Sequence, residues 1–334
     1  MQAIFNYGAG ELRLETVPTP KLKEGRVLLK VLACGICGGE YHLVKTWPGA
    51  VPENEGVIPG HELVGEIVET THTALPQGMR VVVSPNEARC GVCANCRKGW
   101  HTCLNWPQRT VDLGGGYAEY ALIEPRQCHP LPQNVDSVAA ALTEPLACCL
   151  HAARKVNIQP GERVIIVGAG VNAQLFIQIA RLRGAAYILV LDTIHSRHEL
   201  AEQMGADRAI DPEHADPLKA HRSLESGADV VIVTRGKPEF VSTAISLCDY
   251  GGRVLCYGVA LPGMLAQIEP HVLWRKEIAV IGSRSYSNTF PAALDLIGSG
   301  RIRVTPLITR TIKLEETIAA LHNALHQLKT VIVP

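Results

Sequence analysis

Two hydrophobic patterns divide the chain. Up to about residue 145, short apolar runs are separated by glycine and proline, as in RVLLKVLA (26–33), ELVGEIVET (62–70) and GMRVVVSP (78–85). Runs of this length between turn residues predict β-strands joined by loops. We therefore expect residues 1–145 to form an all-β domain.

From residue 163 onward, apolar runs alternate with segments of helical spacing. The run RVIIVGAG is followed by the helical pattern NAQLFIQIARLRG, and further strand-like runs are AYILVLD, GADRAI, GADVVIVT, GGRVLCYG and EIAVIGS. A polar helix is expected after the second run, another before GADVVIVT and one more from about Pro238. Strands that alternate with helices predict an α/β domain with a parallel, doubly wound sheet, here over residues 146–283. The remaining segment, 284–334, has helical patterns near 289–299 and 314–328 and ends in a short apolar TVIV.

The composition supports two folded domains and limits the partners. A chain of 334 residues with 47% hydrophobic residues is long enough for two cores. Lys plus Arg equals Asp plus Glu at 32 each, so no basic excess favours nucleic acid or an anionic membrane as a partner. No apolar run approaches the ~18 residues of a membrane span, and the N-terminal stretch MQAIFNYGAGELRLE has no secretory pattern. We expect a cytoplasmic protein.

The segment VIIVGAGVNA has the features of a dinucleotide-binding turn. Gly168 allows a tight turn after a strand, Gly170 lets a pyrophosphate approach the N-terminus of the next helix, and Ala173 packs closely. Asp192 at the end of the following strand is expected to accept hydrogen bonds from the adenosine ribose and to repel a 2′-phosphate, which favours NAD over NADP. Arg197 is near enough in the sequence to oppose this preference. The alternative is an α/β domain whose glycine turn binds nothing.

Eleven cysteines are unevenly distributed, and four of them are close together. Within CGVCANCRKGWHTC lie Cys90, Cys93, Cys96 and Cys103. In a chain without a secretory pattern, clustered cysteines are more often metal ligands than disulfides. Four thiolates in one loop predict a tetrahedral structural zinc site with no open position, and an iron–sulfur cluster is the alternative.

A second group of possible metal ligands is spread over three segments. The stretch ACGICGGEYH supplies Cys34 and Cys37, PGHELVGE supplies His61 and Glu62, and LTEPLA supplies Glu144. Catalytic zinc keeps about three protein ligands and one exchangeable position, which a Cys, His and Glu set satisfies. A redox dithiol at Cys34 and Cys37 would leave the other two segments unexplained, and a purely structural His61 is the other alternative.

Together these motifs resemble those of the zinc-dependent medium-chain dehydrogenases, in the branch that contains the sorbitol (polyol) and threonine dehydrogenases. The resemblance runs through nearly the whole chain. It implies a GroES-like N-terminal catalytic domain, completed by 284–334, and an inserted Rossmann domain. It also implies a catalytic zinc bound by Cys37, His61 and Glu62, with Glu144 beside the metal or its water. With the four-cysteine site, this makes two zinc ions per chain.

Three features depart from the usual pattern of this family. Gly39 stands where members usually have a Ser or Thr hydroxyl that passes the proton, and Glu40 stands where Asp is usual. The segment between Cys96 and Cys103 is one residue shorter than usual. The first departure affects the usual proton relay, and the last makes Cys103 the least secure structural ligand. The resemblance makes Cys34 a packing residue.

In the tail, GSRSYSNTFP is similar to a stretch of the polyol enzymes in which an Arg–Tyr pair contacts the substrate and the metal-bound water. Tyr286 matches the tyrosine, Ser285 stands at the arginine position and Arg284 is one position early. These polar groups suit a substrate with several hydroxyls, because unpaired polar groups are costly in a pocket for a simple alcohol. Arg284 could also pair with a carboxylate.

The implied reaction is zinc-assisted hydride transfer to NAD from a secondary hydroxyl of a small polyol, sugar acid or cyclitol, which yields a ketone. A water held by Glu144 or Glu62, with His42 further out, is expected to carry the proton away. Within the family, L-threonine 3-dehydrogenase is the alternative. Alternatives of other classes are a zinc-free quinone or enoyl reductase and a non-catalytic nucleotide-binding protein. We expect a homo-dimer or homo-tetramer.

Overall fold

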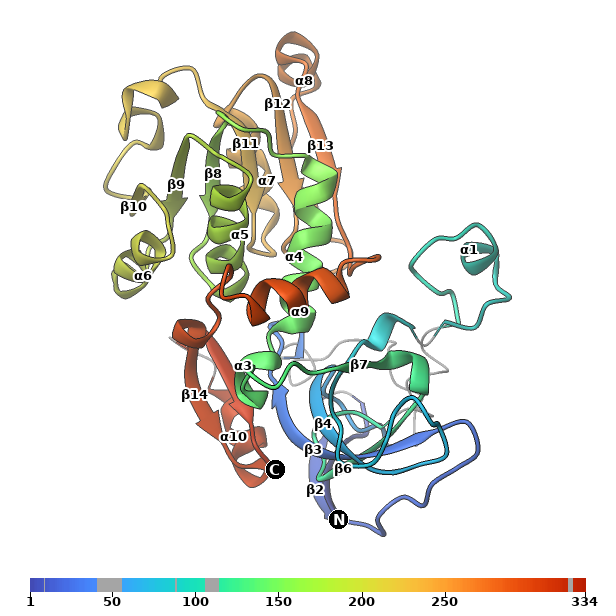
Figure 1. Cartoon of the computed structure of the whole chain (residues 1–334). Coiled ribbons are helices and arrows are strands. Elements are labelled where there is room, and N and C mark those ends of the chain that lie inside the picture. The colour runs from blue at the N-terminus through green and yellow to red at the C-terminus, as the bar shows by residue number, and fades with distance from the viewer. Residues whose placement is uncertain (9, 41–55, 88, 106–113, 324–326) are drawn as a thin grey trace. The chain divides into compact units, whose positions relative to one another are not determined.

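The structure, a computed structural model, describes the chain except for residues 9, 41–55, 88, 106–113 and 324–326 (Figure 1). It contains two compact units. Unit 1 comprises Met1–Pro145 and Phe290–Pro334, and unit 2 comprises Leu146–Thr289. One of the expected site residues, His42, lies outside the described residues.

Unit 1 is built around a seven-stranded sheet. Its strands have the order β14-β15-β3-β4-β5-β7, and β6 also pairs with β3. The strand bounds are β3 Val27–Gly35, β4 Glu62–Thr70, β5 Arg80–Val83, β6 Tyr120–Ile123, β7 Cys128–Pro130, β14 Ile308–Ile312 and β15 Lys329–Ile332. A separate two-stranded sheet contains β1 (Gln2–Asn6) and β2 (Leu12–Thr16). The three apolar runs of the N-terminal segment thus form β3, β4 and β5, as predicted.

Strand β3 lies in the middle of this sheet because most of its side chains are apolar. Seven of its nine residues are buried. It pairs antiparallel with β4, β6 and β15. At its C-terminal end, Gly35 lies opposite Glu62 of β4 and Val331 of β15. Segments that are far apart in the sequence therefore meet where β3 ends.

The helices of unit 1 are short, and not all of them were expected. Helices α1 (Ala94–Arg97), α3 (Ser137–Ala140), α9 (Phe290–Gly298) and α10 (Thr317–His322) belong to this unit, and α4 (Thr143–Val156) begins in it. The all-β prediction for 1–145 is wrong at α1, α3 and the first turn of α4. Asp136 starts α3 by accepting hydrogen bonds from the N–H groups of Val138 and Ala139, and a helix of one turn is too short to give a periodic pattern. The tail helices α9 and α10 were predicted, but α10 is shorter than the pattern over 314–328.

Unit 2 contains a six-stranded parallel sheet with the order β10-β9-β8-β11-β12-β13 (Figure 1). The strand bounds are β8 Arg163–Val167, β9 Tyr187–Leu191, β10 Arg208–Ile210, β11 Ala228–Val233, β12 Cys248–Cys256 and β13 Ala279–Gly282. The order reverses between β8 and β11, as in a doubly wound dinucleotide-binding sheet. The predicted Rossmann architecture is therefore confirmed.

Most helices of unit 2 follow the apolar patterns. Helix α5 (Val171–Leu182) packs against β8 and β9, and α7 (Pro238–Ser246) packs against β11 and β12. Helix α6 (His198–Gln203) packs against β10, and α8 (Pro270–Lys276), which was not predicted, packs against β12. The prediction of a helix before GADVVIVT is wrong. The residues before that run form two single 3₁₀ turns, Pro217–Lys219 and Arg222–Leu224. His221 between them is extended, with φ −156°, so a helix cannot continue through it.

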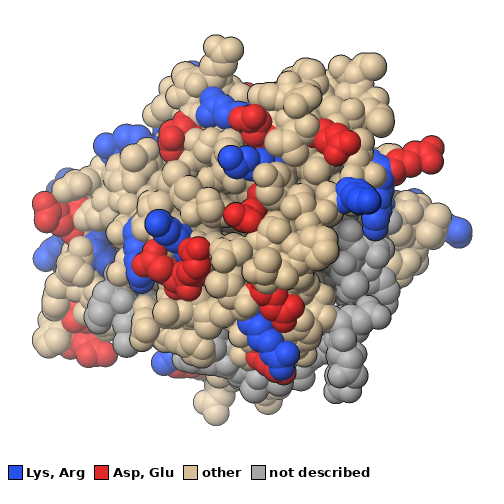
Figure 2. Space-filling view, turned by 90° about the horizontal axis from the view of Figure 1, so that it is seen from below, with Lys and Arg blue, Asp and Glu red and all other residues tan. Residues whose placement is uncertain are grey.

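The surface in Figure 2 carries charges of both signs. Lysine and arginine alternate with aspartate and glutamate on this face, and no large area has one sign. In the parts of the chain that the structure describes, no helix is both long and apolar enough to span a bilayer.

Candidate metal centres and nucleotide site

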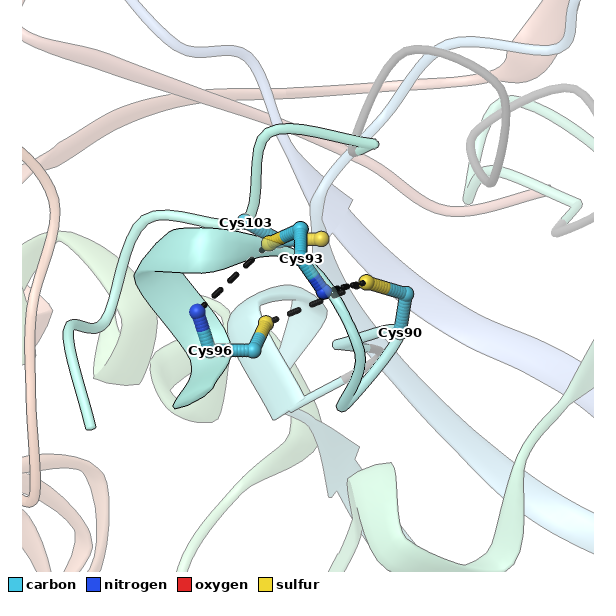
Figure 3. Close-up of side chains that lie close together, drawn as sticks. All are labelled: Cys90, Cys93, Cys96 and Cys103. Atoms are coloured by element: carbon cyan, nitrogen blue, oxygen red, sulfur yellow. Dashed lines mark hydrogen bonds between the residues drawn. The ribbon is translucent and has the colours of Figure 1, made fainter. Parts of the chain in front are cut away.

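Four cysteine sulfur atoms converge around α1 (Figure 3). The sulfur atoms of Cys90, Cys93, Cys96 and Cys103 all lie within 4.8 Å of one another. Cys93 is the N-cap of α1, and hydrogen bonds from the N–H groups of Cys96 and Leu104 lower its pKa to about 6. Four sulfur atoms with a stabilised thiolate among them fit a tetrahedral structural zinc ion. Cys103 belongs to this cluster despite the shorter segment before it.

Cys37, His61 and Glu62 form a second group of converging ligand atoms. One ligand atom of each residue lies within 4.8 Å of the other two. Cys37 follows the end of β3, and His61 and Glu62 stand at the start of β4. The antiparallel register, with Gly35 opposite Glu62, brings the two segments together. Sulfur, imidazole nitrogen and carboxylate oxygen make a donor set of the zinc type.

Glu144 and Cys34 were also candidates, and neither belongs to this group of three. Glu144 lies in the first turn of α4 and is buried. Cys34 is fully buried, and burial raises the pKa of its thiol well above its ordinary value. A buried, protonated thiol behaves as a small apolar residue, as predicted for Cys34. The burial of Cys34 therefore gives no support to a redox pair of Cys34 and Cys37.

The carboxylate of Glu40 supports His61. Glu40 is buried, and its Oε1 lies 3.2 Å from Nδ1 of His61. Partial burial opposes protonation of His61, but the negative charges of Glu40 and Cys37 raise its pKa well above the ordinary value. Burial acts to raise the pKa of Glu40, yet the neighbouring His61 holds it below its ordinary value. With Nδ1 facing Glu40, Nε2 is the nitrogen left for a metal.

A buried lysine that the motifs did not single out lies beside this group. Lys329, the first residue of β15, is 1% exposed. Its Nζ forms an ion pair with Oε2 of Glu62 and donates to the carbonyl of Ile36 at 3.0 Å. Burial acts to lower the pKa of Lys329, but the charge on Glu62 raises it above the ordinary value. A sequence signal was available, since a lysine in the otherwise uncharged strand KTVI needs a buried partner.

The charges around Cys37 leave room for a cation. Two buried carboxylates, Glu40 and Glu62, lie near the thiol of Cys37 and are accompanied by the ammonium of Lys329. Buried charges are stable only when they are paired or coordinate a metal. A zinc ion held by Cys37, His61 and Glu62 therefore fits both the donor atoms and the charge.

Packing does not force the glycine at position 39, where a hydroxyl residue is usual. The N–H of Gly39 lies 3.4 Å from Sγ of Cys37. A Cβ at Gly39 would meet that sulfur at 3.8 Å, which is an ordinary contact. The described residues therefore leave space for a larger residue or a water molecule at this point.

The two glycines of the nucleotide turn differ in the space around them. Gly168 has φ +103°, and a Cβ there would meet Oγ1 of Thr234 at 2.6 Å. Gly170 is the N-cap of α5, and a Cβ there would meet no atom of the described residues within 4 Å. The N-terminus of α5 is therefore open to an anion such as a pyrophosphate. Ala173 is fully buried in α5, as its predicted packing role requires.

Asp192, the acid after β9, is tied to the glycine turn. It is 3% exposed, and its Oδ2 accepts the N–H of Ala169 at 2.6 Å while Oδ1 accepts that of Ile194 at 2.8 Å. Nη1 of Arg197 lies 3.9 Å from Oδ2. Burial lowers the pKa of Arg197, and the positive charge of Arg235 adds to this effect although Asp192 opposes it. A carboxylate and two guanidinium groups thus stand near the turn.

The two predicted substrate residues belong to unit 2 and differ in exposure. Arg284 is exposed, whereas Tyr286 is buried at 3% exposure. Ser285 between them has φ +56°, in the left-handed region.

Two family models match large parts of the chain. The model of the alcohol dehydrogenase GroES-like domain matches residues 23–133, and that of the zinc-binding dehydrogenase matches residues 173–299. Sorbitol dehydrogenase of Bacillus subtilis (strain 168) is 30% identical over 332 residues, which cover 97% of this chain and 94% of the relative. The chain belongs to the zinc-dependent medium-chain dehydrogenase family. Within that family it is similar to polyol dehydrogenases, as the motifs predicted.

Solved structures extend this similarity to the fold. A protein described as a zinc-binding dehydrogenase from Sinorhizobium meliloti 1021, solved with bound NADP, is 32% identical with a TM-score of 0.90 and covers 100% of this chain and 99% of that one. L-idonate 5-dehydrogenase from Escherichia coli is 26% identical with a TM-score of 0.87, and covers 100% and 98%. The fold predicted from the sequence, a GroES-like domain with a Rossmann domain, is confirmed.

Proposed function

We propose that the protein is a zinc-dependent NAD(H) oxidoreductase that oxidises a secondary hydroxyl of a small polyol, sugar acid or cyclitol to a ketone. The observation that carries this proposal is the convergence of Cys37, His61 and Glu62 in a chain that also has an open helix N-terminus at Gly170. A zinc ion and a dinucleotide are the two groups that these sites would hold.

We assign the roles as follows. We assign residues 1–145 and 284–334 to the zinc-binding catalytic domain and 146–283 to the nucleotide-binding domain; the compact units divide instead after Thr289, which puts Arg284 and Tyr286 in unit 2. The chain binds two zinc ions, one catalytic and one held by the four cysteines around α1. A homo-dimer or homo-tetramer in the cytoplasm is the expected working form, and the free cysteines of the chain agree with a reducing compartment.

The side chains around the proposed catalytic zinc position would each have a different role in the reaction. Zinc bound there would supply a Lewis acid that lowers the pKa of the substrate hydroxyl. Glu40 orients the imidazole of His61, and Lys329 holds the carboxylate of Glu62. Of the two acids that could hold the proton-accepting water, Glu62 and Glu144, Glu62 is the poorer candidate because Lys329 already pairs with it. We therefore propose that Glu144 holds the water that accepts the proton from the substrate.

NAD is the proposed cofactor because Asp192 stands at the end of β9. Each of its oxygens already accepts one backbone N–H and can accept one more hydrogen bond, from a ribose hydroxyl. A 2′-phosphate would meet this carboxylate, but it would also meet Arg197. The Sinorhizobium relative was solved with NADP, so kcat/KM must be compared for both cofactors.

The proposed substrate class rests on the polar groups of the tail and on the relatives. Arg284 and Tyr286 supply a guanidinium and a phenol, which suit several hydroxyls or a carboxylate. The relatives named above act on sorbitol and L-idonate. A polyol, a sugar acid or a cyclitol is therefore favoured over an aliphatic alcohol.

The test is a turnover assay with NAD over sorbitol, xylitol, inositol, aldonates, threonine and short alcohols, on protein whose zinc content is known. We expect a polyol, aldonate or cyclitol to give the highest kcat/KM, and Arg284→Ala and Tyr286→Phe to alter that ranking. Ethanol or butanol as the best substrate would overturn the substrate class. Threonine as the best substrate would make the enzyme a threonine 3-dehydrogenase.

A further inference from the structure

Among the described residues, four hydrogen-bond donors reach the carboxylate of Glu40. Its Oε2 accepts the N–H of Cys37 at 3.0 Å and the hydroxyl of Tyr117, and its Oε1 accepts the N–H of Gly60 at 3.2 Å. Nδ1 of His61 lies 3.2 Å from the same Oε1. Two of these donors are backbone groups at or next to zinc-ligand positions, so the orientation of Glu40 controls both segments of the metal group.

Of these four described donors, Tyr117 alone comes from outside the two metal-binding segments. It is fully buried, and its backbone is fixed by hydrogen bonds to Pro59 at 3.0 Å and from Ile4 at 2.8 Å. A Cβ at Gly60 would meet Cδ1 of the Tyr117 ring at 2.6 Å. The ring therefore passes over a glycine with φ +101° and has little freedom to move. Its hydroxyl is held against Glu40.

We propose that Tyr117 is a positioning residue for the catalytic zinc site, an inference that rests on the proposed function. Its hydroxyl fixes Oε2 of Glu40, and this leaves Oε1 directed at Nδ1 of His61. The imidazole is then held in the tautomer that donates from Nδ1 and presents the lone pair of Nε2 to the metal. Without the hydroxyl, Oε2 of Glu40 keeps the N–H of Cys37 as its described donor, so the carboxylate is held less firmly and the orientation of His61 is less well fixed.

The chain contains a matched control for this idea. Tyr7 also donates its hydroxyl to a carboxylate, that of Glu15 at 2.8 Å, in the same unit. Neither Tyr7 nor Glu15 belongs to a metal group among the described residues. Tyr7→Phe therefore removes the same kind of hydrogen bond without touching the zinc site.

The experiment is a zinc competition titration with a chromophoric chelator on the full chain. For Tyr117→Phe we expect the affinity of one of two zinc sites to fall about 10- to 100-fold, the usual range for loss of a partner that orients a ligand. The other site, held by the four cysteines, should be unchanged, as should both sites in Tyr7→Phe. Equal affinities in wild type and Tyr117→Phe would overturn the inference.

A second variant guards against a folding defect. Glu40→Asp keeps the charge but shortens the side chain, so it should lose contact with either Tyr117 or His61 and weaken the same zinc site. In the Glu40→Asp background, Tyr117→Phe should cost less than in wild type, because the two changes act on one network. Additive losses would contradict the proposed link. If the wild type binds zinc only at the four cysteines, the proposed function fails and the inference fails with it. If the wild type binds zinc at two sites and neither variant changes its affinity at either site, only the inference fails.

Discussion

Cys37 and Cys93 are both expected zinc ligands, but their surroundings imply different roles. Cys93 belongs to a closed set of four sulfur atoms, and Cys37 belongs to a mixed set of three donors. We predict that Cys93→Ser lowers stability, because structural zinc contributes directly to folding. We predict that Cys37→Ser abolishes turnover and leaves the fold largely intact.

Elemental analysis, circular dichroism and NAD-dependent turnover check this pair of substitutions. Wild type should contain two zinc ions per chain, and each variant about one. Full activity in Cys37→Ser, or less than half an equivalent of zinc in the wild type, would contradict the assignment.

The ion pair of Lys329 and Glu62 gives a prediction that depends on the metal. Lys329→Met leaves a buried carboxylate without its partner, which should lower the free energy of unfolding by about 3–5 kcal/mol in zinc-free protein. With zinc bound the loss should be smaller, because the metal charge compensates Glu62. Denaturant unfolding with and without zinc measures both values.

A lysine on the exposed side of β3 provides the control for this experiment. Lys30→Met removes the same charge from a strand of the same sheet, at an exposed position. Its effect should stay within about 0.5 kcal/mol. If Lys329→Met lowers the free energy of unfolding equally with and without zinc, the ion pair of Lys329 and Glu62 does not depend on the metal.

Asp192 allows the cofactor preference to be tested at one residue. Asp192→Ala should narrow the ratio of kcat/KM between NAD and NADP, because it removes the carboxylate that a 2′-phosphate would meet. It should also lower stability, since the N–H groups of Ala169 and Ile194 lose their acceptor. Better use of NADP than of NAD by the wild type would show that Arg197 outweighs the acid.

Residue type and spacing led to Cys37, His61, Glu62 and the four cysteines, because metal ligands occur in short motifs. The same reasoning did not reach Tyr117 or Lys329. Their partners, Glu40 and Glu62, are far away in the sequence. The pairing of β3 with β15 brings Lys329 to Glu62, and the packing of the Tyr117 ring against Gly60 brings its hydroxyl to Glu40.

At the level of elements, strands were easier to predict than short helices. Apolar runs such as ELVGEIVET match β4 because a buried strand needs only a few consecutive apolar residues. Helix α4 was not predicted. Its sequence, TEPLACCLHAARKV, begins with residues that are typical of turns, and the boundary between the two units falls within the helix. The helix expected before β11 does not form, because the extended His221 separates two single turns.

Arg163 joins three strands of the parallel sheet and gives a prediction on pH. It begins β8 and donates to Asp229 of β11 at 2.6 Å and to Asp249 of β12 at 2.9 Å. Burial acts to raise the pKa of both acids, but hydrogen bonds from Arg163, and at Asp249 also from Ser226, hold them below the ordinary value. Since the folded pKa values lie below the unfolded value of about 3.9, this stabilisation is present above that pH and is lost as the pH falls through the folded values.

We therefore predict that Arg163→Met lowers the free energy of unfolding at pH 7 on the order of 2 kcal/mol, as expected for lost hydrogen bonds to charged groups. The variant should also lose less stability than the wild type between pH 5 and pH 2. Urea unfolding across this range measures both effects. Lys219→Met, which breaks the exposed ion pair with Asp216, should change neither value appreciably. Parallel pH curves for wild type and Arg163→Met would refute the linkage.

At the scale of the whole molecule, each unit has its own apolar core. The two groups of proposed zinc ligands lie in unit 1, and the glycine turn lies in unit 2. We predict that a strong chelator lowers the unfolding temperature of unit 1, and that NAD at about 100 times its Kd stabilises unit 2 by about 2.7 kcal/mol. Calorimetry or hydrogen exchange resolved by segment distinguishes the two responses. A response to the chelator confined to unit 2 would contradict the placement of the zinc sites.

The return of the chain to its first unit has a consequence for protein synthesis. Unit 2 is a continuous segment, Leu146–Thr289, and can fold while translation continues. Unit 1 needs Phe290–Pro334, which supply β15 and Lys329. Until the ribosome has made that segment, β3 lacks a neighbour and Glu62 lacks its ammonium partner. We therefore expect the proposed catalytic metal group to reach its final arrangement only after Phe290–Pro334 have been made, whereas the four-cysteine loop, which ends at Cys103, can take up a metal earlier.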